Sequence, residues 1–185
     1  MFLDRFLKPG TGRRAGQRLY AATVAQARQP ALYEAMGAPD TPDGRFEIYT
    51  LHVLLLIERL RAEGRSASPV SQALFDAYLG GLDHGLRELA VGDLSVGKTM
   101  RKLGEAFYGR GKALDMAIGR LPDRGELEAL LARTVLSGRA EADPAPLMRY
   151  VLAQRQALAA TPAERLLAGE ADWGGAEPAE TRPCL

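Results

Sequence analysis

The stretch from Asp40 to Arg61 reads DTPDGRFEIYTLHVLLLIERLR, and it decides the fold. It opens with a turn in which Thr41 can cap a helix, followed by a proline that suits a first helical turn. From Phe46 onwards the apolar residues cover nearly the whole circumference of a helix, and such a helix must be buried. The apolar run is shorter than the roughly 20 residues that a membrane span needs. The stretch therefore predicts a buried central helix over about 43–62, with the other helices packed around it.

The composition favours helices over strands. Aromatic residues make up only 6% of the 185 residues, whereas Ala, Leu, Arg and Glu are frequent, and this bias is typical of helical proteins. No segment alternates apolar and polar residues between turns in the way that a half-buried strand does. A chain of this length fits one domain. We therefore predict an all-α fold, a single-domain helical bundle of about seven helices around the buried central helix.

The two ends of the chain differ in composition from the predicted bundle. Residues 1–13 mix apolar and basic side chains and are expected to form a flexible arm, which either binds an anionic membrane surface or packs on the domain. The helical domain is then expected over 14–168. Residues 169–185 are rich in Gly, Ala, Glu and Pro, which predicts a disordered acidic tail. Within that tail, Trp173 is the residue expected to dock back onto the domain.

Charge and cysteine content argue against several classes of protein. The net charge is +1, so general electrostatic attraction does not explain a nucleic-acid partner, and no DNA binding is expected. The single cysteine, Cys184, can form neither an internal disulfide nor a thiolate metal site, which fits a reduced, cytoplasmic location. His52 lies inside the apolar run, where we expect a buried, hydrogen-bonded imidazole rather than a ligand. No catalytic triad, metal site or cofactor is predicted.

Residues 92–99, GDLSVGKT, match the pattern GxxxxGK[ST] of a phosphate-binding loop. In nucleotide-binding proteins this loop follows a buried strand, and its backbone amides surround the phosphates at a helix N-terminus. Here the preceding residues have the pattern of a helix end, and no later strand offers an aspartate for magnesium. We therefore interpret the match as a corner between two helices, and a small ATPase is only an alternative.

The helix expected over about 68–90 carries the densest group of charged residues. Asp83 and Arg87 are one helical turn apart, as are His84 and Glu88. The group is either a polar recognition site or two surface ion pairs of small energetic value.

Three glycines, Gly80, Gly81 and Gly85, interrupt the same helix, where each costs about 0.5–1 kcal/mol relative to alanine. Gly81 and Gly85 share a face, so a close approach to a neighbouring helix is expected there, most simply to the central helix. A kink near Gly80 is the alternative.

The next expected helix, over about 96–121, has a basic first half in which aromatic residues are interleaved. Its relevant side chains are those of Lys98, Arg101, Lys102, Phe107 and Tyr108. Such a face can meet anionic lipid, ribosomal RNA or an acidic partner. The alternative is a solvated basic face on a well-packed bundle.

Two long strings, residues 24–61 and 71–110, resemble the ubiquinol–cytochrome c chaperone family. The resemblance covers about residues 20–117, and its most specific elements are Ala27-Arg28 with Tyr33, the string DTPDGRFE…LH, and LDHGLREL followed by VGDLSV. One departure is Gly97-Lys98-Thr99, where the family usually has proline and further basic residues. The accidental match to a phosphate-binding loop arises at that departure.

The resemblance implies an all-α, non-enzymatic assembly factor, a bacterial relative of the mitochondrial factor that assists cytochrome b during assembly of the bc complex (complex III). The implied partner is newly made or apo cytochrome b, and the further contacts that the resemblance implies are a small partner subunit and the ribosome exit region. The residues themselves, through the N-terminal arm and the basic helix, add an anionic membrane surface as a possible contact, so the expected location is cytoplasmic or peripheral on the inner membrane. The alternative function is that of a peripheral membrane scaffold anchored by residues 1–13.

A chaperone for apolar membrane helices needs a groove that shelters one of them from water. The wall expected for it is the glycine-bearing helix beside the central helix, with the basic helix next to it. The residues expected to bind the partner are Leu82, Asp83, Leu86, Arg87, Glu88, Lys98, Arg101, Lys102, Phe107 and Tyr108.

Overall fold

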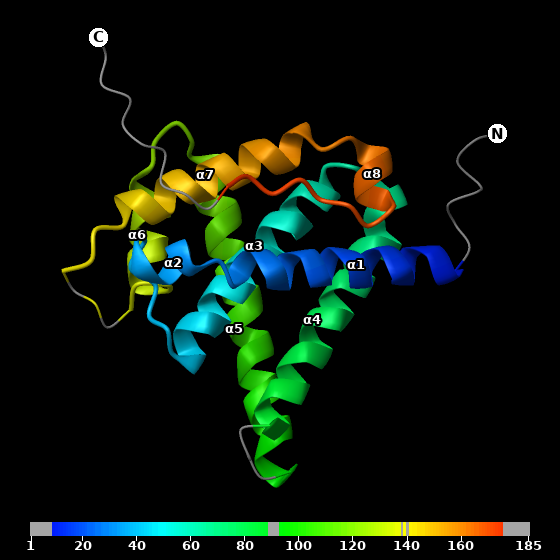
Figure 1. Cartoon of the computed structure of the whole chain (residues 1–185), viewed down its shortest axis with the longest axis horizontal. Coiled ribbons are helices and arrows are strands. Elements are labelled where there is room, and N and C mark those ends of the chain that lie inside the picture. The colour runs from blue at the N-terminus through cyan, green and yellow to red at the C-terminus, as the bar shows by residue number, and fades with distance from the viewer. Residues whose placement is uncertain (1–8, 89–92, 138, 140, 176–185) are drawn as a thin grey trace.

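The computed structural model of the chain describes residues 9–88, 93–137, 139 and 141–175, and within them it contains helices and no strand (Figure 1). The all-α prediction is therefore confirmed. The elements are α1 (Pro9–Ala27), α2 (Pro30–Glu34), α3 (Pro42–Arg61), the short 3-10 helix η2 (Gly64–Ala67), α4 (Ser68–Glu88), α5 (Asp93–Gly119), α6 (Gly125–Arg133), α7 (Ala145–Ala160) and α8 (Ala163–Leu167).

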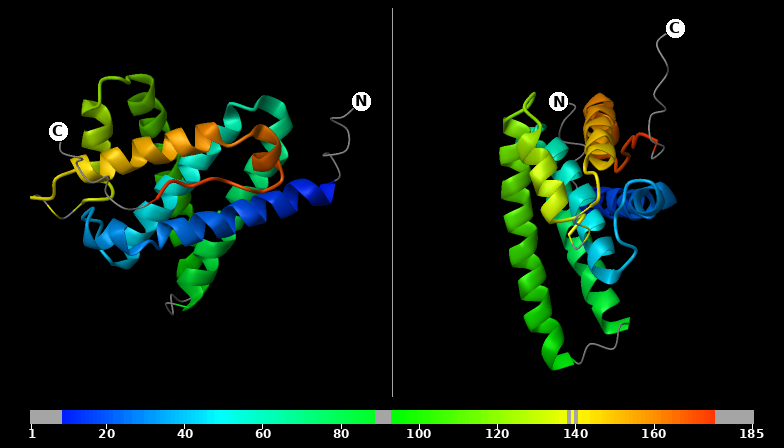
Figure 2. Two further views of the ribbon diagram at one scale, coloured as in Figure 1. Left: turned by 45° about the horizontal axis from the view of Figure 1, so that its top comes forward. Right: turned by 90° about the vertical axis from the view of Figure 1, so that its left-hand side faces the viewer.

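Helix α3 is the predicted central helix, and it is buried on all sides. At its start the Thr41 hydroxyl oxygen accepts a hydrogen bond from the backbone N–H of Gly44 at 3.1 Å, with a proline at the first helical position, as the sequence predicts. Ile48, Leu55 and Leu56 are completely buried. Helices α1, α4, α5 and α7 all contact α3, so it forms the axis of the bundle (Figure 2).

Both ends of the domain extend past their expected limits. Helix α1 begins at Pro9, so the last residues assigned to the flexible arm belong to a helix, and residues 1–8 lie outside the described part of the chain. After α8, residues 169–175 run back between α7 and α1 (Figure 1), and Trp173 packs against the core as expected. The rest of the expected tail, residues 176–185, also lies outside the described residues.

Helices α1 and α4 pack closely because small residues meet at their crossing. A Cβ atom added to Gly16 of α1 would lie 2.5 Å from the Cβ of Ala73 on α4. Gly81 of α4 is also a point of close approach, since an added Cβ would clash with the Tyr20 hydroxyl. The expected close approach therefore occurs at Gly81, but its neighbour is α1 and not the central helix, and Gly85 faces open space, so the expectation is wrong in its partner and at Gly85.

His52 is the centre of a buried hydrogen-bond chain. Its Nδ1 lies 2.7 Å from the carbonyl oxygen of Ile48, which can only accept, so Nδ1 carries the proton. Nε2 then accepts from the Tyr150 hydroxyl at 2.6 Å, and the Tyr150 oxygen accepts from Gln26 at 3.0 Å. Burial lowers the pKa of His52 from 6.5 to about 4, so the imidazole is neutral. The expectation of a hydrogen-bonded core histidine is confirmed.

This histidine makes the stability of the protein depend on pH. The pKa of His52 is lower in the folded chain, about 4, than the 6.5 of an unperturbed histidine, so the unfolded state binds more protons between these values. Stability from this group is complete above pH 6.5 and is lost as the pH falls towards 4. We expect the wild type to lose about 1.6 kcal/mol more free energy of unfolding between pH 6.5 and pH 5 than His52→Gln, measured by urea denaturation. Equal losses in the two proteins would contradict the assignment.

Candidate functional site

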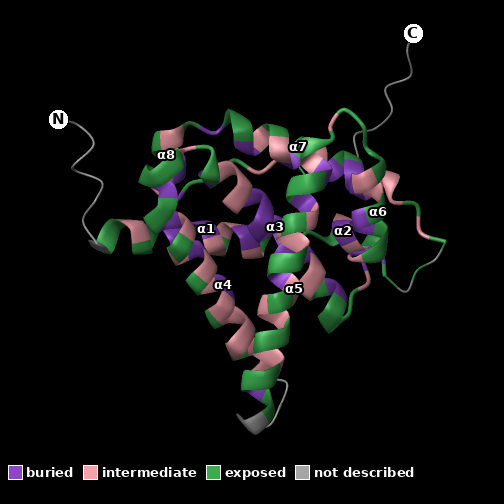
Figure 3. Ribbon diagram, turned by 180° about the vertical axis from the view of Figure 1, so that it is seen from behind, coloured by how far each residue is buried: buried purple, intermediate pink, exposed green. Residues whose placement is uncertain are grey.

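Helices α4 and α5 form an antiparallel hairpin whose far half extends beyond the rest of the bundle (Figures 1 and 2). Where the hairpin meets the bundle, a row of side chains on each helix is buried, namely Val70, Leu74 and Tyr78 on α4 and Phe107, Leu114 and Ala117 on α5, while the described residues towards its tip are mostly exposed or half-buried (Figure 3). Only part of each helix therefore contributes to the core, and the rest is surface.

The structure brings most of the predicted partner-binding residues together on this hairpin. The far half of α4 carries Leu82, Asp83, Leu86, Arg87 and Glu88, and the first half of α5 carries Lys98, Arg101 and Lys102. The two leucines are half-buried, and Leu82 packs against the core. The three basic residues of α5 are exposed.

The charged cluster of α4 consists of ion pairs along one helix. Arg87 Nε donates to Asp83 at 2.8 Å, and His84 Nε2 lies 3.3 Å from the Glu88 carboxylate. The hydrogen bond from Arg87 lowers the pKa of the Asp83 carboxyl. All four side chains are well exposed, so the geometry is that of surface i,i+4 pairs rather than of a preorganised recognition site.

The adjacent aromatic residues of α5 have opposite environments. Phe107 is only 5% exposed, and its ring centre lies 5.0 Å from that of Phe75 and 5.2 Å from that of Tyr78. Tyr108 is 68% exposed, with its ring centre 6.1 Å from that of Phe75. The expectation that both residues face a partner is therefore corrected: Phe107 is a core residue that supports the exposed Tyr108.

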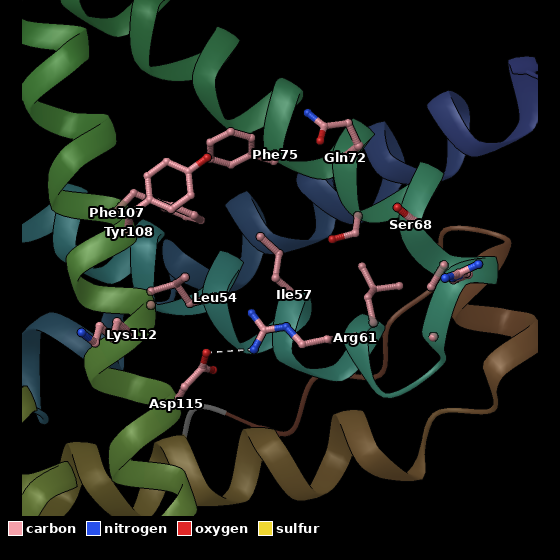
Figure 4. A pocket seen from close by; sticks show the side chains of 16 residues that line it. Leu54, Ile57, Arg61, Ser68, Gln72, Phe75, Phe107, Tyr108, Lys112 and Asp115 are labelled. Carbon is pink, nitrogen blue, oxygen red and sulfur yellow. Dashed lines mark hydrogen bonds and ion pairs between the residues drawn. The ribbon is translucent and has the colours of Figure 1, made fainter.

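A pocket of about 700 Å³ opens where α4 and α5 diverge around the end of α3 (Figure 4). Its apolar side chains are those of Leu54, Ile57, Leu60, Phe75, Phe107 and Tyr108, and its polar ones include Arg61, Ser68, Gln72, Lys112 and Asp115. Leu82 and Leu86 do not line it, so the concave surface lies nearer the core than the sequence indicates. Its position depends on how three helices cross, and no sequence motif marks it.

Charge at this pocket is predominantly positive. Arg61 of α3 donates to Asp115 of α5 at 2.9 Å, and this ion pair spans the two helices along the pocket (Figure 4). Arg65 of η2 and Lys112 of α5 also line the pocket and are exposed. Neither forms an ion pair with any carboxylate in the described part of the chain. The pocket therefore combines an apolar wall with two uncompensated cations.

The apparent phosphate-binding loop lies mostly inside a helix. Asp93 to Thr99 form the first two turns of α5, and Gly92 lies outside the described residues. The segment between α4 and α5 is not preceded by a strand, because α4 is helical to Glu88. The interpretation of the match as a corner between two helices is consistent with this arrangement, since the described residues 93–99 are not free to surround a phosphate.

No helix among the described residues has the length and hydropathy required to cross a membrane. Within the same residues, no group of three or more His, Cys, Asp or Glu side chains could hold a metal ion.

Residues 34–173 match the family described as ubiquinol-cytochrome C chaperone. The match covers most of the chain, and this protein belongs to that family, whose members are chaperones for the assembly of complex III. The resemblance noted in the sequence is confirmed. Membership implies a role in assembly rather than in catalysis.

Similar proteins agree with this assignment. The crystal structure of a Cbp3 homolog from Brucella abortus is 35% identical and superimposes with a TM-score of 0.80, over 95% of this chain and 98% of that one. Ubiquinol-cytochrome-c reductase complex assembly factor 1 of Xenopus laevis is 26% identical over 163 residues, which are 86% of this chain and 80% of the relative. The mouse protein of the same name is 28% identical over 86% of this chain, which spans 54% of the mouse protein.

Two neighbouring substitutions test the separation of core and surface on α5. We expect Phe107→Ala to lower the free energy of unfolding by about 3–5 kcal/mol, because it leaves a cavity among packed rings. Tyr108→Ala removes a mostly exposed ring and is expected to cost about 1 kcal/mol or less. Urea denaturation of both variants measures the difference, and comparable losses would contradict the placement of the two rings.

Proposed function

We propose that this protein binds newly made or apo cytochrome b and assists its assembly into complex III by binding, without catalysis. The observation that supports this most is the pocket between α3, α4 and α5, in a chain that belongs to a family of complex III assembly chaperones. Its apolar wall is exposed at Tyr108 and partly exposed at Ile57 and Phe75.

The physical problem of such a client is apolar surface in water. Helices that will later cross a membrane expose apolar side chains. Removing these side chains from water is favourable by a free energy of roughly 25 cal/mol per Å² of apolar area. A groove between helices covers one face of an incoming helix without unfolding the chaperone. Aromatic side chains supply large contact area at the rim, and the hydroxyl of Tyr108 can still reach water.

The basic face of α5 is the proposed second contact. Lys98, Arg101 and Lys102 are exposed at the far end of the hairpin, away from the pocket, and Arg101 pairs with Glu105 at 3.1 Å. We propose that this face meets an anionic surface on the cytoplasmic side of the inner membrane. That surface is lipid headgroups, a small partner subunit or the ribosome exit region.

Loss of the gene tests the proposed function. We expect a deletion strain to lose most of its assembled cytochrome b, measured as the b-type absorbance of reduced-minus-oxidised membranes and as intact complex III on a native gel. A plasmid copy of the wild type is expected to restore both. Normal levels of complex III in the deletion strain would overturn the proposal.

Charge reversal tests the basic face. Arg101→Glu with Lys102→Glu is expected to weaken co-purification with partners and binding to vesicles that contain anionic lipid, because both residues then repel a negative surface. Both side chains are exposed, so the helical circular dichroism is expected to stay unchanged. The matched control is Arg14→Glu with Arg149→Glu. It changes the net charge of the protein by the same amount, but on α1 and α7. Unchanged co-purification and vesicle binding would contradict the proposed binding role of the basic face of α5.

A further inference from the structure

We propose that the pocket between α3, α4 and α5 recognises an amphipathic helical segment in which a carboxylate lies about one turn from the apolar anchor. The inference rests on the proposed function and deepens it, because it states which kind of client segment the pocket selects. It follows from the apolar wall, the charge of the rim and the spacing of two residues on α5.

The apolar part of the pocket is preformed. Leu54, Leu60 and Phe107 are at most 7% exposed, so they are held in place by the core. Phe75 and Tyr108 come from α4 and α5, and Figure 4 shows their rings next to each other at the edge of the pocket. Its volume, about 700 Å³, lies in the range of pockets that enclose an apolar group and a few polar ones. An apolar side chain can therefore enter without a rearrangement of the bundle.

The charged side chains around the pocket determine which charge the bound segment carries. Among the charged side chains that line the pocket, Arg61 and Asp115 neutralise each other at 2.9 Å, whereas Arg65 and Lys112 have no ion-pair partner among the described residues. Two cations beside an apolar wall attract a carboxylate and repel a basic segment. An acidic amphipathic segment therefore binds the pocket more tightly than a purely apolar segment, which makes no ion pair with Arg65 or Lys112.

The spacing on α5 indicates a helix as the occupant. Tyr108 and Lys112 are four residues apart, so their side chains are neighbours on one face of α5. An occupant helix that runs alongside α5 presents an apolar and an acidic side chain at the same i,i+4 spacing. Both walls of the pocket are themselves helices, which is the arrangement in which a helix lies in a groove.

Photo-cross-linking identifies the occupant directly. Gln72 lies on the α4 wall of the pocket and is exposed, so it can be replaced by p-benzoylphenylalanine (Figure 4). After irradiation of living cells, mass spectrometry of the adduct is expected to find a protein segment that has Asp or Glu three or four residues from large apolar residues. Adducts only with lipid, or with segments that lack such a carboxylate, would overturn the inference.

Charge variants test the rim with matched controls. Arg65→Glu with Lys112→Glu is expected to reduce the yield of the protein adduct about five- to tenfold, because two attractions become repulsions. Arg65→Lys with Lys112→Arg keeps the charge and is expected to retain the yield within about twofold. Arg14→Glu with Arg149→Glu makes the same change in net charge outside the pocket and should also retain it. An equal loss in this control, or no loss in the reversed pair, would overturn the inference.

The proposed function and this inference fail in distinguishable ways. If complex III forms normally in the deletion strain, the proposed function fails, while cross-linking still reports what enters the pocket. If the deletion abolishes complex III and the reversed pair restores it fully, the function stands and the selection of a carboxylate is wrong. As a final check, replacing the cross-linked carboxylate of the client with Lys is expected to restore the adduct with the reversed pair.

Discussion

The burial of α3 on every side is the constraint on which the rest of the structure depends. A helix with apolar residues around its whole circumference has to be covered from several directions, and α1, α4, α5 and α7 provide that cover. Polar groups of α3 set the positions of these neighbours. Thr50 shares a 2.7 Å hydrogen bond with Tyr78 of α4, and His52 accepts from Tyr150 of α7. Because unpaired polar groups in the core are costly, these contacts favour one arrangement of the helices.

Ion pairs from the two ends of α3 complete this arrangement and give rise to the site. Glu47 pairs with Arg110 of α5, and Glu58 pairs with Arg155 of α7 at 2.8 Å, so the two carboxylates act structurally and independently. Helix α5 has 27 residues and α3 has 20, so the central helix cannot cover the whole of its neighbour. The part of α5 that α3 does not cover pairs with α4 as the projecting end of the hairpin. The pocket forms where α4 and α5 move apart and the end of α3 lies between them.

Local patterns in the sequence predict the fold and the family well, and the site only in part. The cap at Thr41, the buried helix after it and the neutral His52 all follow from neighbours in sequence or from the apolar pattern. The different burial of Phe107 and Tyr108 does not, because it depends on the rotation of α5 about its axis. The contact of Gly81 with Tyr20 and the pocket around Ile57, Phe75 and Lys112 depend on crossings between helices distant in sequence. Such geometry is set by packing, which no single segment encodes.

We propose that this helical chaperone holds cytochrome b before complex III is complete. The most direct test of this proposal is a brief pulse of labelled amino acids, followed by isolation of the tagged protein and a chase. Labelled cytochrome b is expected to be enriched with the tagged protein at the end of the pulse. The label is then expected to leave it during the chase as it appears in complex III. No enrichment over an unrelated tagged protein, with normal labelling of cytochrome b, would contradict the account.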